Sequence, residues 1–347
     1  MNKINHPIGN KLRALALGIS VIATTGGVQA AELLGRSVLP AETFATGPTS
    51  GQFTNGGNGL ATPFANKQPV QGFSAILPGP KKGTYFVMMD NGFGNKPSSP
   101  DLLLRVFAVK PDFKTGTVLP VDRHTGKVLE SFTDQSFFTL NDPKKRLPFG
   151  IVADGENYPG TAVSAPGPIA VDPAISSKRL LTGWDFDIES VRRTADGSFW
   201  FGDEFGPFLI HTDKDGRVLE APVALPNVHE FPNTLGGSSI NPWVQSPSNP
   251  LLASASDTNL PNSGGFEGMA LNKSGTRLYA LLEKAMSGDS VRNRLWIHEF
   301  DLKTRAYTGE TFAYPMDSAS HAIGDFTAIT DRDYLIIERD NGQGDAS

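Results

Sequence analysis

Short aromatic and apolar runs recur along the chain, and each pair of runs ends at acidic residues. In residues 184–207, the apolar run 188–191 is followed by Asp196-Gly197 and then by the aromatic run 198–202. Glycine accepts the positive φ that a tight hairpin turn requires, and aromatic residues favour strands over helices. This pattern predicts an antiparallel hairpin that ends at the acidic pair Asp203-Glu204.

The same hairpin pattern occurs four times in order, which indicates a repeat architecture. The four copies are residues 73–92, 188–204, 266–284 and 326–342. A second hairpin follows three of them, at residues 102–116, 208–216 and 294–304. Two hairpins form a four-stranded antiparallel unit, and such units arranged around an axis are the blades of a propeller. The sequence therefore predicts an all-β fold, a β-propeller of four-stranded antiparallel blades; a β-sandwich is the alternative.

The spacing of the copies is irregular, and this leads to further expectations. Residues 118–180 leave room for one more, poorly matching blade, and residues 33–39 are compatible with a strand. Residues 227–263 are rich in Pro, Asn, Ser and Gly and predict a long surface insertion. The sequence stops at Ser347, where the fourth copy should continue. We therefore expect a propeller of six blades in the complete protein, with its C-terminal part missing here.

The first thirty residues have the composition of an export signal. Lys3, Lys11 and Arg13 precede an apolar segment at residues 15–23, and small residues lead to Ala30. This order predicts a signal peptide, residues 1–30, cleaved near Ala30, and a periplasmic or secreted domain at residues 31–347. An N-terminal helix of the fold is the alternative.

Composition excludes several classes of protein. The chain of 347 residues has no cysteine, so disulfides, thiolate nucleophiles and cysteine metal sites are absent. Removal of three positive charges with the signal would take the net charge from −5 to −8. An acidic surface argues against nucleic acid as a partner, and no later stretch is apolar enough for membrane insertion. We expect a small-molecule partner.

Acidic residues lie at comparable ends of the predicted strands. Those at the start of a copy are Asp187, Glu189, Glu267 and Asp325, and those at its end are Asp90, Asp203, Glu204, Glu283, Glu338 and Asp340. Equivalent strand ends of a propeller converge on one channel mouth, where crowded carboxylates repel and a cation relieves them. Oxygen ligands without cysteine or clustered histidine favour Ca²⁺ over Zn²⁺ or Cu²⁺. The alternative is that these acids are ordinary turn residues.

Two basic residues directly follow the acids that end the third and fourth copies. Lys284 and Arg339 could face a bound phosphate, or they could neutralise the neighbouring acids. No G-x-S-x-G, Walker or H-E-x-x-H motif occurs. His211 and His298 lie in matched predicted strands and are interpreted as sheet residues rather than ligands.

Four segments together resemble one known family. Residues 185–190, 200–208, 265–270 and 337–342 are similar to the phytase-like propellers called "esterase-like activity of phytase". The resemblance runs from about Leu33 to the end. It implies an exported propeller whose repeated Asp and Glu residues serve phosphoester hydrolysis.

The leading hypothesis is an exported phosphoester hydrolase whose channel acids hold Ca²⁺. The residues expected to act in catalysis are Glu189, Asp203, Glu204, Glu267 and Glu338, and further metal ligands are Asp187, Asp90, Glu283 and Asp340. Arg339 and Lys284 are the candidates for binding the substrate phosphate. The alternatives are a metal-dependent lactonase and a non-catalytic ligand-binding propeller of the cell envelope.

Overall fold

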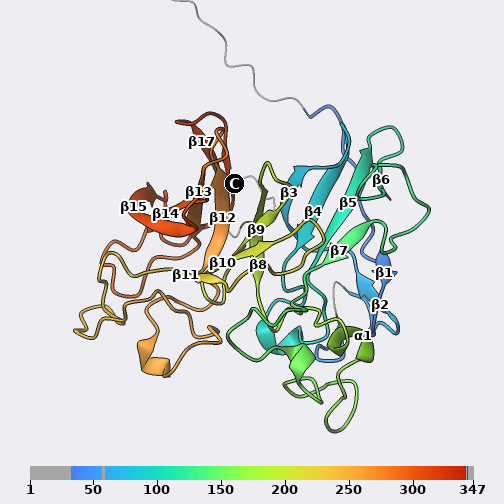
Figure 1. Cartoon of the computed structure of the whole chain (residues 1–347), viewed down its shortest axis with the longest axis horizontal. Helices are drawn as coiled ribbons and strands as arrows, with labels where there is room; N and C mark the ends of the chain where they lie inside the picture. The colour runs from blue at the N-terminus through green and yellow to red at the C-terminus, as the bar shows by residue number, and fades with distance from the viewer. Residues whose placement is uncertain (1–32, 57–58, 341, 343–347) are drawn as a thin grey trace, which may run out of the picture. The chain divides into compact units, whose positions relative to one another are not determined.

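The structure, a computed structural model, describes residues 33–56, 59–340 and 342 (Figure 1). The chain divides into a unit Met1–Arg36 and a unit Ser37–Ser347. The expected signal peptide, residues 1–30, lies outside the described residues. None of the helices in the described part is both long and apolar enough to span a membrane.

The larger unit consists mainly of short antiparallel strands. The first sheet contains β3 (Phe73–Pro78), β4 (Tyr85–Met89), β5 (Arg105–Asp112) and β6 (Thr117–Pro120), with β7 (Phe137–Thr139) also paired to β5. The second sheet contains β8 (Ile188–Arg193), β9 (Phe199–Asp203), β10 (Phe208–Thr212) and β11 (Val223–Ala224). The third contains β12 (Phe266–Leu271), β13 (Arg277–Leu282), β14 (Arg294–Asp301) and β15 (Ala306–Pro315). These sheets confirm the predicted all-β fold of four-stranded antiparallel units.

Smaller elements complete the described part. The fourth predicted copy is a two-stranded sheet of β16 (Ala322–Ala328) and β17 (Tyr334–Arg339), and β1 (Phe44–Thr46) pairs with β2 (Lys67–Pro69). The helical elements are α1 (Pro173–Ser176) and three 3₁₀ turns at Lys96–Ser98, Val152–Asp154 and Ala255–Asp257.

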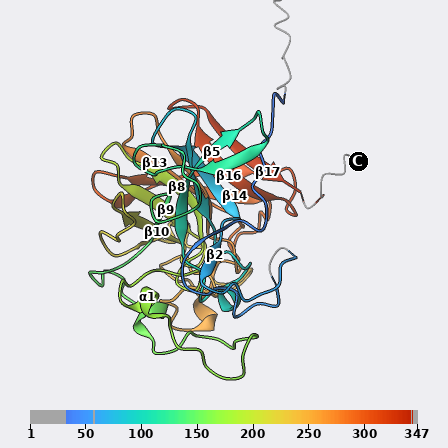
Figure 2. The ribbon, with the colours of Figure 1, turned by 90° about the vertical axis from the view of Figure 1, so that its right-hand side faces the viewer.

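The first strands of successive sheets lie next to one another. β3 contacts β8, β8 contacts β12, and β12 contacts β16, while the remaining strands of each sheet follow outward in sequence order. Figure 2 shows this order for β8, β9 and β10. Propeller blades have this arrangement, in which equivalent ends of the inner strands come close together.

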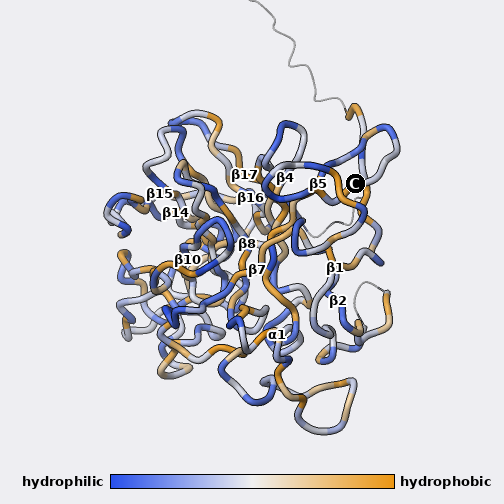
Figure 3. The backbone as a smooth tube through the Cα atoms, turned by 45° about the vertical axis from the view of Figure 1, so that its right-hand side comes forward, coloured by the Kyte–Doolittle hydropathy of each residue, from blue (hydrophilic) through white to orange (hydrophobic). Residues whose placement is uncertain are grey.

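The apolar core lies between neighbouring sheets. One cluster joins the first two sheets through side chains such as Phe86 and Phe199, and another joins the second and third through Trp200 and Phe300. Strands buried on both faces need apolar side chains at consecutive positions, which explains the unbroken aromatic run of β9. Figure 3 shows the hydrophobic stretches of β4 and β5.

An irregularity recurs at the same point of all four first strands. The register shifts between Phe73 and Ala75, between Ile188 and Ser190, between Phe266 and Gly268, and between Ile323 and Phe326. A β-bulge leaves a residue unpaired and redirects its side chain. The bulged residues are Ser74, Glu189 and Glu267 in the first three strands, and Gly324 with Asp325 in the fourth.

Two expectations about organisation were wrong. Residues 118–180 do not form a blade of their own among the described residues, because β7 pairs with β5 and extends the first sheet. Residues 33–39 contain only an isolated bridge from Val38 to Thr117. The insertion at residues 227–263 is irregular as predicted, but it also contributes Val244 and Leu260 to the core.

Candidate functional site

Three acidic residues occupy the same backbone position in the first three sheets. Each follows the second strand, and its N–H donates to the carbonyl of the residue that precedes the first strand. The bonds join Asp90 to Gly72 (3.1 Å), Glu204 to Asp187 (2.8 Å) and Glu283 to Gly265 (2.8 Å). In the fourth sheet the matching pair is Arg339 and Ala322. The repeated hairpin therefore brings three carboxylates and one guanidinium to equivalent strand ends.

Two further carboxylates come from the bulges of the second and third sheets. Carboxylate oxygens of Asp187, Glu189 and Glu204 lie within 4.8 Å of one another, and so do those of Glu204, Glu267 and Glu283. Glu204 belongs to both groups, so the five acids form one continuous carboxylate cluster. Each group places three oxygens close enough to hold a metal ion.

Burial and mutual repulsion raise the pKa values in this cluster. Asp90 belongs to neither group, but it is close enough to Asp187 that burial, followed by the charge of Asp187, raises its pKa to about 7. Burial and then Glu283 raise the pKa of Glu267 to about 9. Burial is also the first cause of the raised pKa values of Asp187, Glu189 and Glu204. In the absence of a counter-ion, burial therefore favours the protonated form of these carboxyl groups, and a bound cation would favour the ionised form.

Two neutral side chains orient the acids, and the sequence analysis missed both. Asn91 donates to the Asp187 carboxylate from its backbone N (3.2 Å) and from Nδ2 (2.6 Å). The Ser263 hydroxyl donates to Glu204 Oε2 at 2.7 Å. Asn91 directly follows one of the predicted acids and could have been found from that position, whereas Ser263 lies in a long loop and carries no local signal.

Asp203 is buried beside the cluster but is engaged by the backbone. Its carboxylate accepts hydrogen bonds from the N–H of Asp187 (2.9 Å) and of Gly206 (2.7 Å). Burial raises its pKa to about 7. Asp203 belongs to neither carboxylate group, and its contacts hold the two chain segments that carry Asp187 and Glu204.

A cavity of about 400 Å³ contains the predicted phosphate-binding residues. Glu283, Lys284, Arg292, His321 and Arg339 contribute to its walls. Lys284 Nζ lies 3.2 Å from Glu283 Oε2, and Arg292 donates to backbone carbonyls. Arg339 is close enough to Glu267 for its charge to oppose the rise in pKa that burial causes. Cationic groups and the edge of the carboxylate cluster therefore share this cavity.

Glu338 lies outside the carboxylate cluster. Its carboxylate accepts from the Tyr314 hydroxyl (2.7 Å) and the Asp317 N–H (2.8 Å), and it contacts His321 Nδ1 at 2.6 Å. In the fourth sheet, Glu338 aligns with the last paired residue of the second strand in the other sheets. Arg339 therefore takes the position after that residue, which was expected for Glu338. Glu338 holds the segment that carries His321 along the cavity wall.

Two more predicted acids are also placed elsewhere. Asp340 accepts from the Gly342 N–H at 2.8 Å, as a turn residue does. Asp325 forms an ion pair with the buried Arg192 at 2.8 Å. Neither belongs to a carboxylate group that the structure brings together.

A serine, a histidine and a glutamate form a hydrogen-bonded chain in the second sheet, near the strand ends opposite to those that carry the carboxylate cluster. His211 Nε2 is 3.0 Å from Ser198 Oγ, and His211 Nδ1 is 2.8 Å from Glu220 Oε1. Ser198 Oγ also lies 2.7 Å from Asp196 Oδ1 and 2.7 Å from Thr194 Oγ1. Since Asp196 and Thr194 belong to the same tight turn, these contacts fasten the β8–β9 hairpin.

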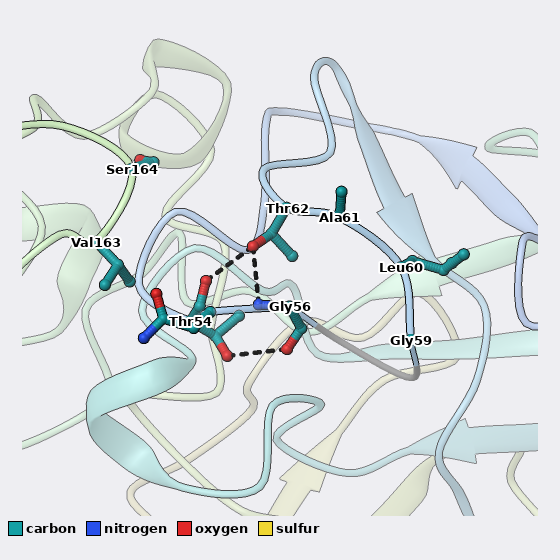
Figure 4. A pocket seen from close by; sticks show the side chains of 9 residues that line it. Thr54, Gly56, Gly59, Leu60, Ala61, Thr62, Val163 and Ser164 are labelled. Carbon is teal, nitrogen blue, oxygen red and sulfur yellow. Dashed lines mark hydrogen bonds between the residues drawn. The ribbon is translucent and has the colours of Figure 1, made fainter.

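A cavity of about 660 Å³ is lined by residues 54–56, 59–62 and 163–164 (Figure 4). Thr62 Oγ1 donates to the Thr54 carbonyl at 2.8 Å and accepts from the Gly56 N–H at 3.0 Å. The residues lining this cavity are Thr54, Asn55, Gly56, Gly59, Leu60, Ala61, Thr62, Val163 and Ser164. They include no acid or base, so this cavity lacks the chemistry of the carboxylate cluster.

Fold and site together define an all-β protein of four-stranded sheets that gathers carboxylates at equivalent strand ends. Residues 68–347 match the model of the phytase-like family, described as "Esterase-like activity of phytase". The chain belongs to this family.

Individual relatives are more distant. A protein of Arthroderma benhamiae described as an uncharacterized secreted protein is 27% identical over 241 residues, which are 60% of this chain and 45% of that protein. The chain thus spans less than half the length of this relative.

Solved structures show weaker similarity. Virginiamycin B lyase from Staphylococcus aureus is 10% identical with a TM-score of 0.27, covering 76% of this chain and 61% of that one. The β-propeller domain of Cps50 (Swd1) from Myceliophteria thermophila is 12% identical with a TM-score of 0.20, covering 74% and 90%.

Proposed function

We propose that this protein is an exported hydrolase of phosphoesters that uses Ca²⁺ held by the carboxylate cluster. The observation that carries the proposal is that Glu204 belongs to two carboxylate groups at once, beside a cavity lined by Lys284, Arg292 and Arg339. Carboxylates that bind a cation and basic side chains that bind the phosphate both serve metal-assisted phosphoester hydrolysis.

The carboxylate cluster fits a hard cation. Ca²⁺ binds oxygen ligands at about 2.3–2.6 Å, so two ligands on opposite sides of one ion lie up to about 5 Å apart. The oxygens of each group lie within 4.8 Å of one another, which agrees with this geometry. The donors are all carboxylates, and soft metals prefer thiolate or imidazole. Asp187, Glu189 and Glu204 would hold one ion, with Glu204 shared toward Glu267 and Glu283.

The residues around the cluster suit the steps of hydrolysis. When bound, the cation would offset substrate charge and lower the pKa of an attacking water. Lys284 and Arg339 would contact the phosphate oxygens from the cavity side, where the planar guanidinium can donate two parallel hydrogen bonds. Glu267, whose pKa burial raises to about 9 in the absence of a cation, would release its proton when the cation binds and would join Glu204 and Glu283 as a ligand.

Export is supported by two independent features. The first thirty residues have the charge order and small residues of a signal peptide, and the relative from Arthroderma benhamiae is described as secreted. Millimolar Ca²⁺ is common outside cells, so a site of modest affinity would be filled there.

The test is turnover by the full chain on phytate, on a phosphomonoester and on a glycerophosphodiester, with Ca²⁺ and with chelator. We expect hydrolysis of at least one substrate that requires Ca²⁺ and that falls at least a hundredfold in Glu204→Gln. Glu310→Gln, an exposed glutamate on β15, is the matched control and should retain full activity. Absence of turnover on all three substrates would refute the hydrolase. Lactone turnover without phosphoester hydrolysis would replace it by a lactonase.

A further inference from the structure

A third cavity, of about 490 Å³, opens beside the first sheet and shares no residue with the carboxylate cluster. Its charged lining consists of Arg105, Arg123, Lys178 and Arg217 against Asp134 and Asp215. The lining therefore carries two more basic than acidic side chains, one of which, Arg217, also pairs at 3.0 Å with Asp213 outside the lining, whereas the chain as a whole carries a net charge of −5. Its volume lies in the range of cavities that bind small ligands.

Arg105 is the unusual member of this lining. Its side chain is 4% exposed, and it uses two hydrogen bonds, from Nε to Thr139 Oγ1 (3.1 Å) and from Nη1 to the Thr46 carbonyl (2.9 Å). The guanidinium lies 3.9 Å from the centre of the Phe137 ring. Three of its five N–H groups remain, and no carboxylate in residues 33–56, 59–340 or 342 forms an ion pair with it.

A buried guanidinium without a carboxylate is costly, because desolvation penalises its charged form. Burial accordingly lowers the pKa of Arg105 to about 9. Arg192 on β8 is also deeply buried, at 6% exposed, but it has a counter-ion, since Asp325 lies 2.8 Å away. The fold therefore provides a carboxylate for one buried arginine and leaves the other facing a cavity.

The cavity side of Arg105 is open. Arg105 lines the cavity, and a methyl group at Gly47 would lie 3.0 Å from Arg105 Nη2, so a side chain at position 47 would crowd the guanidinium. Asp215 is already engaged by Arg123 at 2.8 Å and by Arg217 at 3.4 Å. Arg105 thus supplies positive charge that the described protein groups do not neutralise.

We propose that this cavity binds a small organic phosphate, whose phosphate group is anchored by the free edge of Arg105. A phosphate monoester carries nearly two negative charges at neutral pH, and the lining offers it Arg105 and Lys178, which form no ion pair with a carboxylate of the described residues. The planar guanidinium donates paired hydrogen bonds to phosphate oxygens. Leu103, Phe138 and Leu180 contribute apolar surface to the same cavity, and this surface suits the organic part of the ligand.

The experiment measures binding of glycerol 3-phosphate to the full chain by calorimetry in chelator, where the carboxylate cluster repels anions and does not support turnover. We expect one site, weakened at least tenfold in Arg105→Met and partly retained in Arg105→Lys, which keeps the charge but loses the fork. Arg193→Met, an exposed arginine that lies over Phe86 and Phe199, is the control and should bind like the wild type. Inorganic phosphate should bind more weakly, and acetate should not compete.

A stability measurement separates ligand binding from a structural role. If Arg105 anchors an anion, Arg105→Met should keep or raise the melting temperature without ligand and should lose the rise caused by glycerol 3-phosphate. A fall in melting temperature that is equal with and without ligand would identify a structural clamp and overturn the proposal. Equal binding by wild type and Arg105→Met, no binding by wild type, or binding of carboxylates instead of phosphates would overturn it as well. Each of these results is independent of hydrolysis at the carboxylate cluster.

Discussion

Replacement of Glu267 by glutamine should stabilise the protein in chelator while removing its function. Burial and neighbouring acids raise the pKa of Glu267 to about 9, whereas the carboxyl has a pKa near 4.5 when the chain is unfolded. Between these values the folded chain holds a proton that the unfolded chain has released, so stability falls as pH rises. From pH 4.5 to pH 7 the loss is about 3 kcal/mol at about 1.36 kcal/mol for each unit. Glutamine has the same shape and no charge, so Glu267→Gln should recover most of this loss.

The assay is urea unfolding at 25 °C from pH 5 to pH 9, in chelator and in Ca²⁺. In chelator we expect wild-type stability to decline through this window and Glu267→Gln to give a flatter curve, more stable at pH 7. Added Ca²⁺ should stabilise the wild type, by about 2.7 kcal/mol at a hundred times the dissociation constant, and stabilise the variant much less. Glu310→Gln should change neither curve by more than about 0.5 kcal/mol.

Two results would refute this reasoning. A Glu267→Gln protein that is less stable than wild type in chelator would show that the carboxylate is satisfied within the fold. An unchanged Ca²⁺ effect would show that Glu267 is not near the cation. A variant that is more stable than wild type in chelator and responds less to Ca²⁺ distinguishes a functional site from a structural ion pair, in which loss of one partner destabilises.

Four other changes test separate parts of the site. Arg339→Gln should raise KM for phosphoesters several-fold, with a smaller change in kcat, in steady-state assays. Glu338→Gln should have a milder effect of the same kind, because it releases the His321 segment from the cavity wall. Gly265→Ala should lower activity and destabilise by about 1–3 kcal/mol in urea unfolding, since its methyl group would lie 2.5 Å from the Glu204 backbone. Ser198→Ala should cost about 1 kcal/mol of stability yet leave hydrolysis intact, and a fluorophosphonate should not label the protein; loss of activity with Ser198 labelling would instead identify a serine hydrolase.

The repeated hairpins could be predicted because their signals are local. An Asp-Gly turn between an apolar run and an aromatic run defines β8 and β9 without reference to any other part of the chain. The pairing of β7 with β5 is different, since Phe137 lies about thirty residues from Phe107, which it opposes. No local sequence pattern specifies that contact. Without such a signal, residues 118–180 were expected to form an extra blade rather than to extend the first sheet.

The error over Glu338 has a geometric cause. Matching motifs placed Glu338 beside Glu204 and Glu283, but the irregular stretch of the fourth sheet leaves Ile337 unpaired on β17 as well as Gly324 and Asp325 on β16, which moves the end of β17 by one position. Neighbouring residues of a strand point to opposite faces, so a shift of one position exchanges them completely. Arg339 consequently occupies the equivalent position, and the acid next to it faces Tyr314 and His321. Sequence alone cannot give the register across a bulge.

The equivalent positions of the four sheets carry different residues, so negative and positive charge lie on different sides of the site. The bulges of the second and third sheets carry Glu189 and Glu267, while the first carries Ser74 and the fourth Gly324 with Asp325. Acidic charge is thereby concentrated at the ends of β8 and β12, and the fourth sheet contributes Arg339. A strictly symmetrical set of carboxylates would bind a cation but would repel an anionic substrate equally from every side. Because one equivalent position is basic, the cavity of Lys284 and Arg339 offers an anion a route to the cluster, and this polarity supports the proposed phosphoester hydrolysis over simple cation storage.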